Sequence, residues 1–156
     1  FRIPVFTKRA KRIVSQHPKF YYFDTGVFRS LRPHGPLDLP EEIGGAALEG
    51  LVAQHLRAFC DYDSRGYQMF FWRTKSGTEV DFILYGPDDI IAIEVKRTAQ
   101  IRPADVSGLK AFRTDYPKAR TLFVYGGKES LVIDGIRYMP FELFLRRFAP
   151  GWNWLS

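Results

Sequence analysis

The sequence lacks the features that mark several large classes of protein. It has a single cysteine, Cys60, so no internal disulfide can form, and no Cys/His/Asn signature of a cysteine nucleophile surrounds it. No apolar run approaches the roughly 20 residues that a membrane-spanning helix needs. No secretory signal peptide is visible, although the chain begins at Phe1 and not at methionine, which favours a fragment of a longer protein. We therefore expect a cytoplasmic domain without a membrane partner.

Two common nucleotide and metal motifs are also missing. The phosphate-binding loop pattern G-x-x-x-x-G-K-[ST] fails at Gly127-Lys128, because Glu129 follows and no earlier glycine has the required spacing. None of the three histidines has zinc-type spacing with Cys60. We therefore expect no nucleotide hydrolysis by this segment, and we expect His55 to pack or hydrogen-bond locally.

What the sequence does have is the composition of one globular domain. Its 156 residues are 46% hydrophobic and 26% charged, and a formal net charge of +6 permits contact with nucleic acid. The most basic stretch contains Lys8, Arg9, Lys11 and Arg12. This stretch is either a solvated face or a phosphate-binding surface.

Turn residues and apolar periodicity divide the chain into parts. We expect residues 1–18 to be a basic arm or the remnant of a preceding domain, residues 19–148 to be the folded domain, and residues 149–156 to be a tail. The expected elements are strand 19–23, helices 27–31 and 41–61, strands 67–73, 78–84 and 90–96, helix 103–115, strands 120–125, 131–133 and 136–139, and helix 141–148. The central order is α-β-β-β-α-β, which predicts an α/β fold with a mixed central sheet and helices on both faces.

Charged side chains interrupt two of the apolar strands, where a charge is costly unless it is paired or binds a metal. Strict alternation places Glu79, Asp81 and Ile83 on one face of their strand and Val80, Phe82 and Leu84 on the other. In the next strand, Glu94 and Lys96 share a face for the same reason. Each of the two strands therefore presents acidic groups on one face of the predicted sheet.

The turn between these strands predicts their register. A four-residue loop at 86–89 places Tyr85 opposite Ile90 and, if no bulge intervenes, Asp81 directly opposite Glu94. Directly opposed residues have Cβ atoms about 4.5–5.5 Å apart. Two carboxylates so close repel each other, and a divalent cation that prefers oxygen ligands would remove the repulsion. The register therefore predicts a site for Mg²⁺ or Mn²⁺.

The long helix supplies a third carboxylate, Glu49. Small and apolar residues lie one turn before and one turn after it, so Glu49 lies on an apolar face of the helix. Either Glu49 joins the acidic pair, or it forms an ion pair with Lys96 or accepts a hydrogen bond from a backbone amide.

These residues together resemble a known pattern. Asp81 and, after twelve intervening residues, the segment EVK that starts at Glu94 are similar to the D…(D/E)xK signature of the PD-(D/E)xK nuclease superfamily. Val80 stands where the short name of the superfamily has a proline. The helix with Glu49 and the helix that starts at Pro103 resemble the order of elements in that superfamily. The resemblance implies a restriction-endonuclease-like core.

The resemblance also implies roles for four side chains. Asp81 and Glu94 would hold Mg²⁺ or Mn²⁺, and Glu49 would complete the site through a second metal ion or a metal-bound water. Lys96 would orient the attacking water and stabilise charge on the phosphate. All four are therefore candidate catalytic residues.

Four segments that cover much of the chain resemble one family more closely. They are KFYYFDTGVFRSL, GGAALEGLVAQHL, FFWRTKSGTEVDFIL and IAIEVKRT. They are similar to the domain of unknown function found at the C-terminus of many prokaryotic AAA+ ATPases. This resemblance implies a nuclease-like fold joined to an upstream ATPase in the same chain.

Two functions of different kinds remain open. The first is a metal-dependent endonuclease that hydrolyses DNA phosphodiester bonds. The second is a catalytically silent nuclease fold that docks DNA or a protein partner for the attached ATPase. The complete set of acidic residues and lysine favours the first. Arg73 and Lys75, in the turn before the strand of Asp81, either contact a DNA backbone or form a polar loop.

Overall fold

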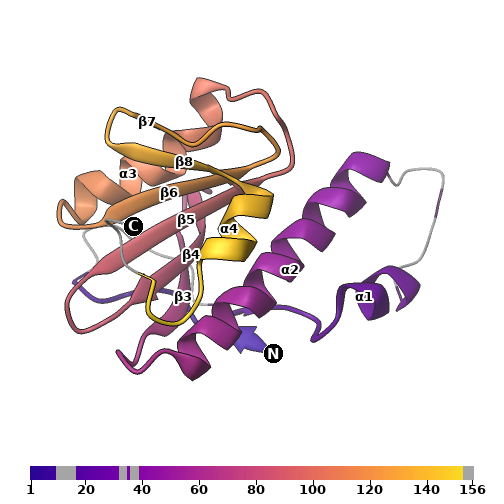
Figure 1. Ribbon diagram of the computed structural model, residues 1–156, viewed down its shortest axis with the longest axis horizontal. Coiled ribbons are helices and arrows are strands. Elements are labelled where there is room, and N and C mark those ends of the chain that lie inside the picture. Colours follow the sequence, from indigo (N-terminus) through magenta and orange to yellow (C-terminus); the bar gives the residue numbers. More distant parts are fainter. Residues whose placement is uncertain (10–16, 32–34, 36–38, 153–156) are drawn as a thin grey trace.

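A six-stranded mixed sheet forms the centre of the structure, a computed structural model that describes residues 1–9, 17–31, 35 and 39–152 (Figure 1). The sheet has the strand order β3-β4-β5-β6-β8-β7. Its strands are β3 (Gln68–Arg73), β4 (Glu79–Tyr85), β5 (Ile90–Lys96), β6 (Arg120–Tyr125), β7 (Leu131–Ile133) and β8 (Ile136–Pro140). β5, β6 and β8 are parallel, and the other pairs are antiparallel. The predicted mixed sheet with an antiparallel β4–β5 hairpin is confirmed.

Helices cover both faces of this sheet (Figure 1). They are α1 (Thr25–Leu31), α2 (Pro40–Tyr62), α3 (Ser107–Asp115), which follows a 3-10 turn at Pro103–Val106, and α4 (Phe141–Arg147). α2 and α4 pack on one face and α3 packs on the other, while α1 lies beside α2 at the periphery. Within the described part of the chain, no helix has the length and apolar character needed to cross a membrane.

Local sequence explains where several of these elements begin and end. α2 starts with Pro40 at its first turn and with Glu41 and Glu42 beside it, where the helix dipole favours acidic side chains. The hairpin between β7 and β8 turns through Asp134 and Gly135, which both have positive φ angles, 52° and 75°, as a tight two-residue turn requires. The first predicted strand is shorter than expected, because only Lys19–Phe20 (β2) pairs, with β1 (Arg2–Ile3).

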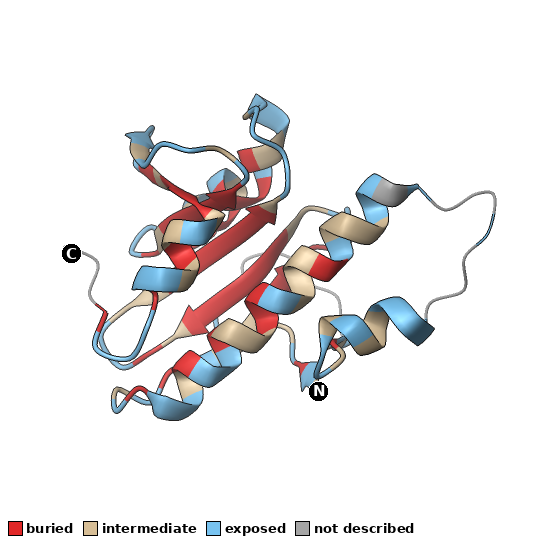
Figure 2. Ribbon diagram, turned by 45° about the vertical axis from the view of Figure 1, so that its right-hand side comes forward, coloured by how far each residue is buried: buried red, intermediate tan, exposed pale blue. Residues whose placement is uncertain are grey.

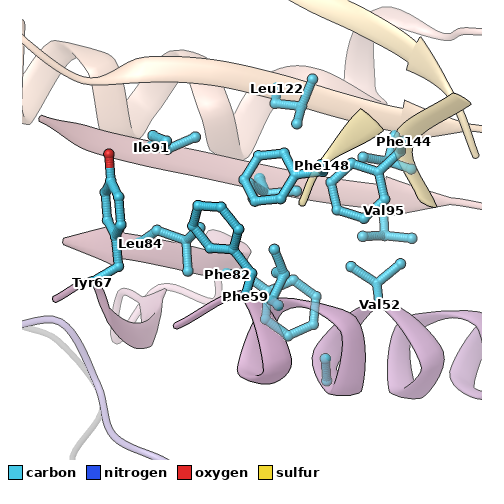
Figure 3. Close-up of a cluster of buried hydrophobic side chains, with 14 of the residues drawn as sticks. Val52, Phe59, Tyr67, Phe82, Leu84, Ile91, Val95, Leu122, Phe144 and Phe148 are labelled. Atoms are coloured by element: carbon cyan, nitrogen blue, oxygen red, sulfur yellow. The ribbon is translucent and has the colours of Figure 1, made fainter. Parts of the chain in front are cut away.

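The first half of the core lies between the sheet and α2. Val52 and Phe59 of α2 face Phe82, Leu84 and other apolar side chains of the sheet (Figure 3). Figure 2 shows buried residues along the central strands and along the side of α2 that faces them. Because each such side chain contributes roughly 1.5–3 kcal/mol on burial, this layer fixes α2 on the sheet.

The second half of the core lies between the sheet and α3. Leu109 and Phe112 of α3 pack with Ile83, Ala92 and Phe123 of the central strands. The central strands are therefore buried on both faces, which explains why their sequences are almost continuously apolar.

A β-bulge interrupts β4 at Asp81. One residue of β3, Phe71, lies opposite two residues of β4, Asp81 and Phe82. The extra residue reverses the alternation of side chains, so Val80 packs with Ile83 on the α3 face and Phe82 stays on the α2 face. The prediction that Val80 shares a face with Phe82 and Leu84 is therefore wrong.

Both ends of the described chain pack against the domain. Ile3 and Phe6 are buried, and the Phe6 amide donates a hydrogen bond of 2.7 Å to the Phe71 carbonyl at the edge of β3. Residues 1–6 thus belong to the packed domain, although they fall within the stretch 1–18 that was expected to be an arm.

An ion pair between buried Asp63 and half-buried Arg65 holds the other end of the chain. Asp63 accepts two hydrogen bonds of 2.8 Å from Arg65 and one of 3.0 Å from the Gly151 amide. Arg65 also donates to the Trp152 carbonyl at 2.7 Å, and Trp152 is buried in the first half of the core. The packing therefore continues into the expected tail, of which residues 153–156 lie outside the described residues.

The close approach of α3 to β4 predicts an unusual effect of an alanine in a helix. A Cβ atom on Gly108 would lie 1.9 Å from the carbonyl oxygen of Glu79, which is backbone and cannot move aside cheaply. Gly108→Ala should therefore destabilise the fold by roughly 1–3 kcal/mol. In the matched control Gly45→Ala, nothing lies within 4 Å of the added Cβ. That change should stabilise by about 0.5–1 kcal/mol. Urea unfolding of both variants checks the difference, and a stabilised Gly108→Ala would contradict this packing.

Candidate metal centre

Four carboxylates from three elements meet near the bulge, and we call them the acidic cluster. They are Glu49 of α2, Glu79 and Asp81 of β4, and Glu94 of β5. Asp81 is 8% exposed and Glu94 is 7% exposed, so both are buried in the sheet. Because a buried carboxylate is costly unless it is paired, the cluster requires positive charge close by.

The β4–β5 ladder stops just before the acidic residues. Its register pairs Tyr85 with Ile90, as the four-residue loop predicted, and it continues to the pair of Phe82 and Ile93. The next pair in this register would bring Asp81 opposite its acidic partner on β5, but the ladder does not include it. β4 and β5 are therefore not paired at the point where strict pairing had placed the two carboxylates face to face.

The Asp81 side chain takes the place of a backbone partner where the ladder ends. Its Oδ2 atom accepts a hydrogen bond of 2.9 Å from the backbone amide of Val95. A buried backbone amide needs such a partner, and a charged acceptor makes a stronger hydrogen bond than a neutral one. The contact fixes Asp81 next to the residue that follows Glu94.

Glu94 has one paired oxygen and one that is not paired. The Nζ atom of Lys96 lies 3.1 Å from Glu94 Oε1. Glu94 Oε2 is buried and has no hydrogen-bond partner among the described residues. Glu94 and Lys96 line an open groove of about 460 Å³ together with Glu79 and residues of the 76–78 turn and the 104–108 segment. An unpaired buried carboxylate oxygen beside a groove is a potential cation ligand.

Lys19 of β2 is a central residue of this site that the sequence analysis missed. Its Nζ atom lies 3.1 Å from Glu49 Oε1 and 3.5 Å from Asp81 Oδ1, and it also contacts Glu79 Oε1. The Tyr21 hydroxyl donates a hydrogen bond to the same Glu49 oxygen. The only signal in the sequence was a lysine at the start of the apolar segment KFYYF, which is easily taken for a solvated strand end.

The turn between β3 and β4 brings one predicted DNA-binding residue to the cluster. Arg73 Nε lies 3.5 Å from Glu79 Oε2, and the Arg73 side chain is 53% exposed. Lys75 is exposed in the same turn, which a hydrogen bond of 2.8 Å from the Thr74 amide to the Thr78 carbonyl closes. Both cations can therefore reach a molecule bound at the groove.

The basic residues before β2 lie elsewhere. Lys8 Nζ is 3.9 Å from the centre of the Tyr85 ring, at the opposite end of β4 from the acidic cluster. Arg9 is exposed next to it. Lys11 and Arg12 lie outside the described residues. The structure thus does not bring Lys8 to the site with the carboxylates.

Comparison with protein-family models gives a match over most of the domain. The family model described as "Domain of unknown function (DUF4143)" matches residues 44–144, about two thirds of the chain. The chain belongs to this family. A domain-of-unknown-function family, which four sequence segments predicted, is therefore confirmed, while the attached ATPase and the nuclease activity stay predictions. The match includes all four carboxylates of the acidic cluster and begins after Lys19. No curated protein matches the chain.

Burial and mutual repulsion shift the titration of this DUF4143 site. Burial raises the pKa of Asp81 above its usual range, and the charge of Glu49 raises it further. Burial also raises the pKa of Glu94, and the charge of Asp81 adds to the effect. Burial alone would lower the pKa of Lys19, but the charges of Asp81 and Glu49 raise it, so Lys19 stays protonated. The two buried carboxyls therefore lack sufficient positive charge when both are ionised.

The donor atoms of the site fit a hard divalent cation, although they do not yet form a complete set of metal ligands. Among the described residues, no group of three or more His, Cys, Asp or Glu side chains is already arranged to hold a metal ion. The unpaired Oε2 of Glu94 and the neighbouring carboxylate of Asp81 are the oxygen ligands that Mg²⁺ and Mn²⁺ prefer.

The pKa shift of Glu94 predicts how stability depends on pH without metal. A carboxyl whose pKa is raised by folding stabilises the fold fully below its ordinary pKa of 4.5, and that contribution is lost as the pH rises towards about 8. Unfolding free energy should therefore fall across this range, and Glu94→Gln should flatten the fall. At about pH 8 the variant should be more stable than the wild type by roughly 1 kcal/mol or more.

The matched control for this measurement is Glu129→Gln, in an exposed loop position. Its pH profile in chelator-treated buffer should follow that of the wild type. If Glu94→Gln follows the wild type as well, Glu94 is not the strained carboxyl that the structure describes.

Proposed function

We propose that this domain is a metal-dependent, nuclease-like domain that hydrolyses DNA phosphodiester bonds and is attached to an upstream AAA+ ATPase in the same chain. The observation that carries the proposal is the buried, unpaired Oε2 of Glu94, which lies beside Asp81 while Lys96 pairs with the other oxygen. Such an oxygen is costly to bury and gains most from a bound cation.

The order of elements supports a restriction-endonuclease-like core. α2, β3, β4, β5, α3 and β6 follow one another as α-β-β-β-α-β, which is the order that the resemblance implies. The acidic residues lie on the second and third of these strands, and Glu49 comes from the preceding helix. The bulge at Asp81 agrees with this reading, because bulges often re-aim a side chain next to an active site.

Three carboxylates of the acidic cluster and Lys96 have defined parts in the proposed reaction. Asp81 and Glu94 would hold Mg²⁺ or Mn²⁺, and Glu49 would complete the acidic site. When bound, the ion supplies a Lewis acid that activates water and offsets phosphate charge. The Lys96 ammonium group would donate hydrogen bonds that orient the attacking water, and it would stabilise the negative charge that develops on the phosphate. Asp81 keeps its position through the Val95 amide.

The basic residues near the groove support DNA as the substrate. Arg73 ends β3 beside the acidic cluster, Lys75 lies in the turn that follows, and the chain has a formal net charge of +6. Contacts between such side chains and phosphate groups hold a nucleic acid in place without reading its sequence. These two residues would keep the polyanion next to an otherwise negative site.

One observation favours the alternative, a catalytically silent nuclease fold that docks DNA or a protein partner for the ATPase. Lys19 contacts three carboxylates of the cluster and offsets part of their charge without a metal ion. If Lys19 never leaves room for a cation, the fold is retained while the chemistry is lost. The two functions therefore differ in whether metal supports cleavage.

Cleavage assays with the full-length protein, ATP and Mn²⁺ separate the two functions. Wild type should cut linear or branched DNA, and chelation should stop the reaction. Asp81→Asn and Glu94→Gln should each lower the rate by more than the roughly 10–100-fold that loss of an outer-shell partner costs. Their metal-free melting temperatures should stay equal to or above that of the wild type, because each change removes a buried charge.

The exposed control Glu129→Gln should keep full activity in the same assay. If the wild type shifts the mobility of DNA but cuts none with Mn²⁺ or Mg²⁺, the silent docking function replaces the nuclease. Equal cleavage by wild type and Asp81→Asn would also rule out the proposed metal site.

A further inference from the structure

Lys19 occupies a place that a cation of higher charge could also occupy. Its side chain is 22% exposed, and its ammonium group contacts Glu49, Glu79 and Asp81. An ammonium group has three N–H donors and so can serve three carboxylates at once. A Lys19 that belonged to the solvated surface would not need three acidic partners from two separate elements.

Glu49 is held towards Lys19 and not towards the groove. The same Glu49 oxygen that Lys19 contacts also accepts a hydrogen bond from the hydroxyl group of Tyr21, which is buried. Two donors on one oxygen fix the position of the carboxylate. Glu49 therefore acts first on Lys19, while Oε2 of Glu94, a residue that lines the groove, is buried and has no hydrogen-bond partner among the described residues.

The charges of the site indicate how many cations it can take. When all four carboxylates of the acidic cluster are ionised, the ammonium groups of Lys19 and Lys96 offset two of their charges, which leaves two negative charges. Arg73 is half exposed, so water screens its contribution. One divalent cation would neutralise these two residual negative charges. Removal of Lys19 would leave three, and it would also vacate the space among three carboxylates.

We propose that Lys19 takes the place of a second metal ion, so that the site binds one divalent cation per chain, with Asp81 and Glu94 as its carboxylate ligands. This inference rests on the proposed metal-dependent function. Lys19 is thus a positioning residue: it holds Glu49 and Glu79 through charge and keeps the acidic cluster folded before the cation arrives. Lys19 would set the stoichiometry of the site, and Lys96 would act on the substrate.

Calorimetric titration of the metal-free full-length protein with Mn²⁺ alone tests the proposal. Because an upstream ATPase could bind Mn²⁺ itself, the counted quantity is the difference from Asp81→Asn. Wild type should show one additional ion per chain, Lys19→Met should show two, and Lys19→Arg, which keeps the charge, should show one. Lys118→Met, at an exposed lysine in the turn between α3 and β6, is the matched control and should behave as wild type.

Thermal unfolding in metal-free buffer gives a second, independent measurement. Lys19→Met should lower the melting temperature, because three carboxylates lose their counter-cation, and Mn²⁺ should raise it by more than it does for wild type. Lys19→Arg should recover part of the loss. If Lys19→Met does not fold without metal, Mn²⁺ should restore its circular dichroism spectrum, and failure to restore it overturns the inference.

The outcomes distinguish this inference from the function on which it rests. Two additional ions in wild type, or the same number in wild type and Lys19→Met, overturn the role of Lys19 while leaving a metal site in place. No ion in wild type but one in Lys19→Met supports Lys19 as the stand-in for a metal and removes the proposed nuclease function. No ion in either protein overturns both.

Discussion

The hydrogen bond from the Val95 amide to the Asp81 carboxylate is the contact around which the candidate site is built. It exists because a bulge in β4 turns Asp81 out of the ladder, and a charged oxygen then takes the place of a backbone acceptor. The same distortion directs Asp81 towards Lys19, while Glu94 and Lys96 lie beside the groove next to α3. The core on both faces of the sheet keeps the strands from relaxing this arrangement.

The second constraint is the cost of buried negative charge. Asp81 and Glu94 lie in a sheet that is apolar on both faces, and burial raises the pKa of each. Lys19 and Lys96 offset part of this charge from opposite sides, through separate contacts. The negative charge that remains supports the proposed cation-dependent function. A fold selected only for stability would gain from losing one of these carboxyls.

Much of the fold could be predicted from the sequence because local signals determine it. The bounds of β5 and β6 and the Tyr85–Ile90 register follow from apolar runs and from turn residues that lie between them. The bulge at Asp81 could not be predicted, since it depends on pairing with β3 and on packing against both helical layers. Lys19 was missed for a similar reason. β2 reaches the acidic cluster only because it pairs with the first residues of the chain, a contact that no sequence pattern signals.

The most direct test of this account is the electron density of crystals soaked in Mn²⁺, with anomalous scattering used to locate the ion. One peak per domain should lie beside Oε2 of Glu94 and a carboxylate oxygen of Asp81. Its distance from each oxygen should be about 2.0–2.2 Å, because hard divalent ions bind oxygen ligands at that range. Lys19 should still contact Glu49 in that structure. A peak at the position of the Lys19 ammonium group, or no peak near Glu94 at saturating Mn²⁺, would contradict it.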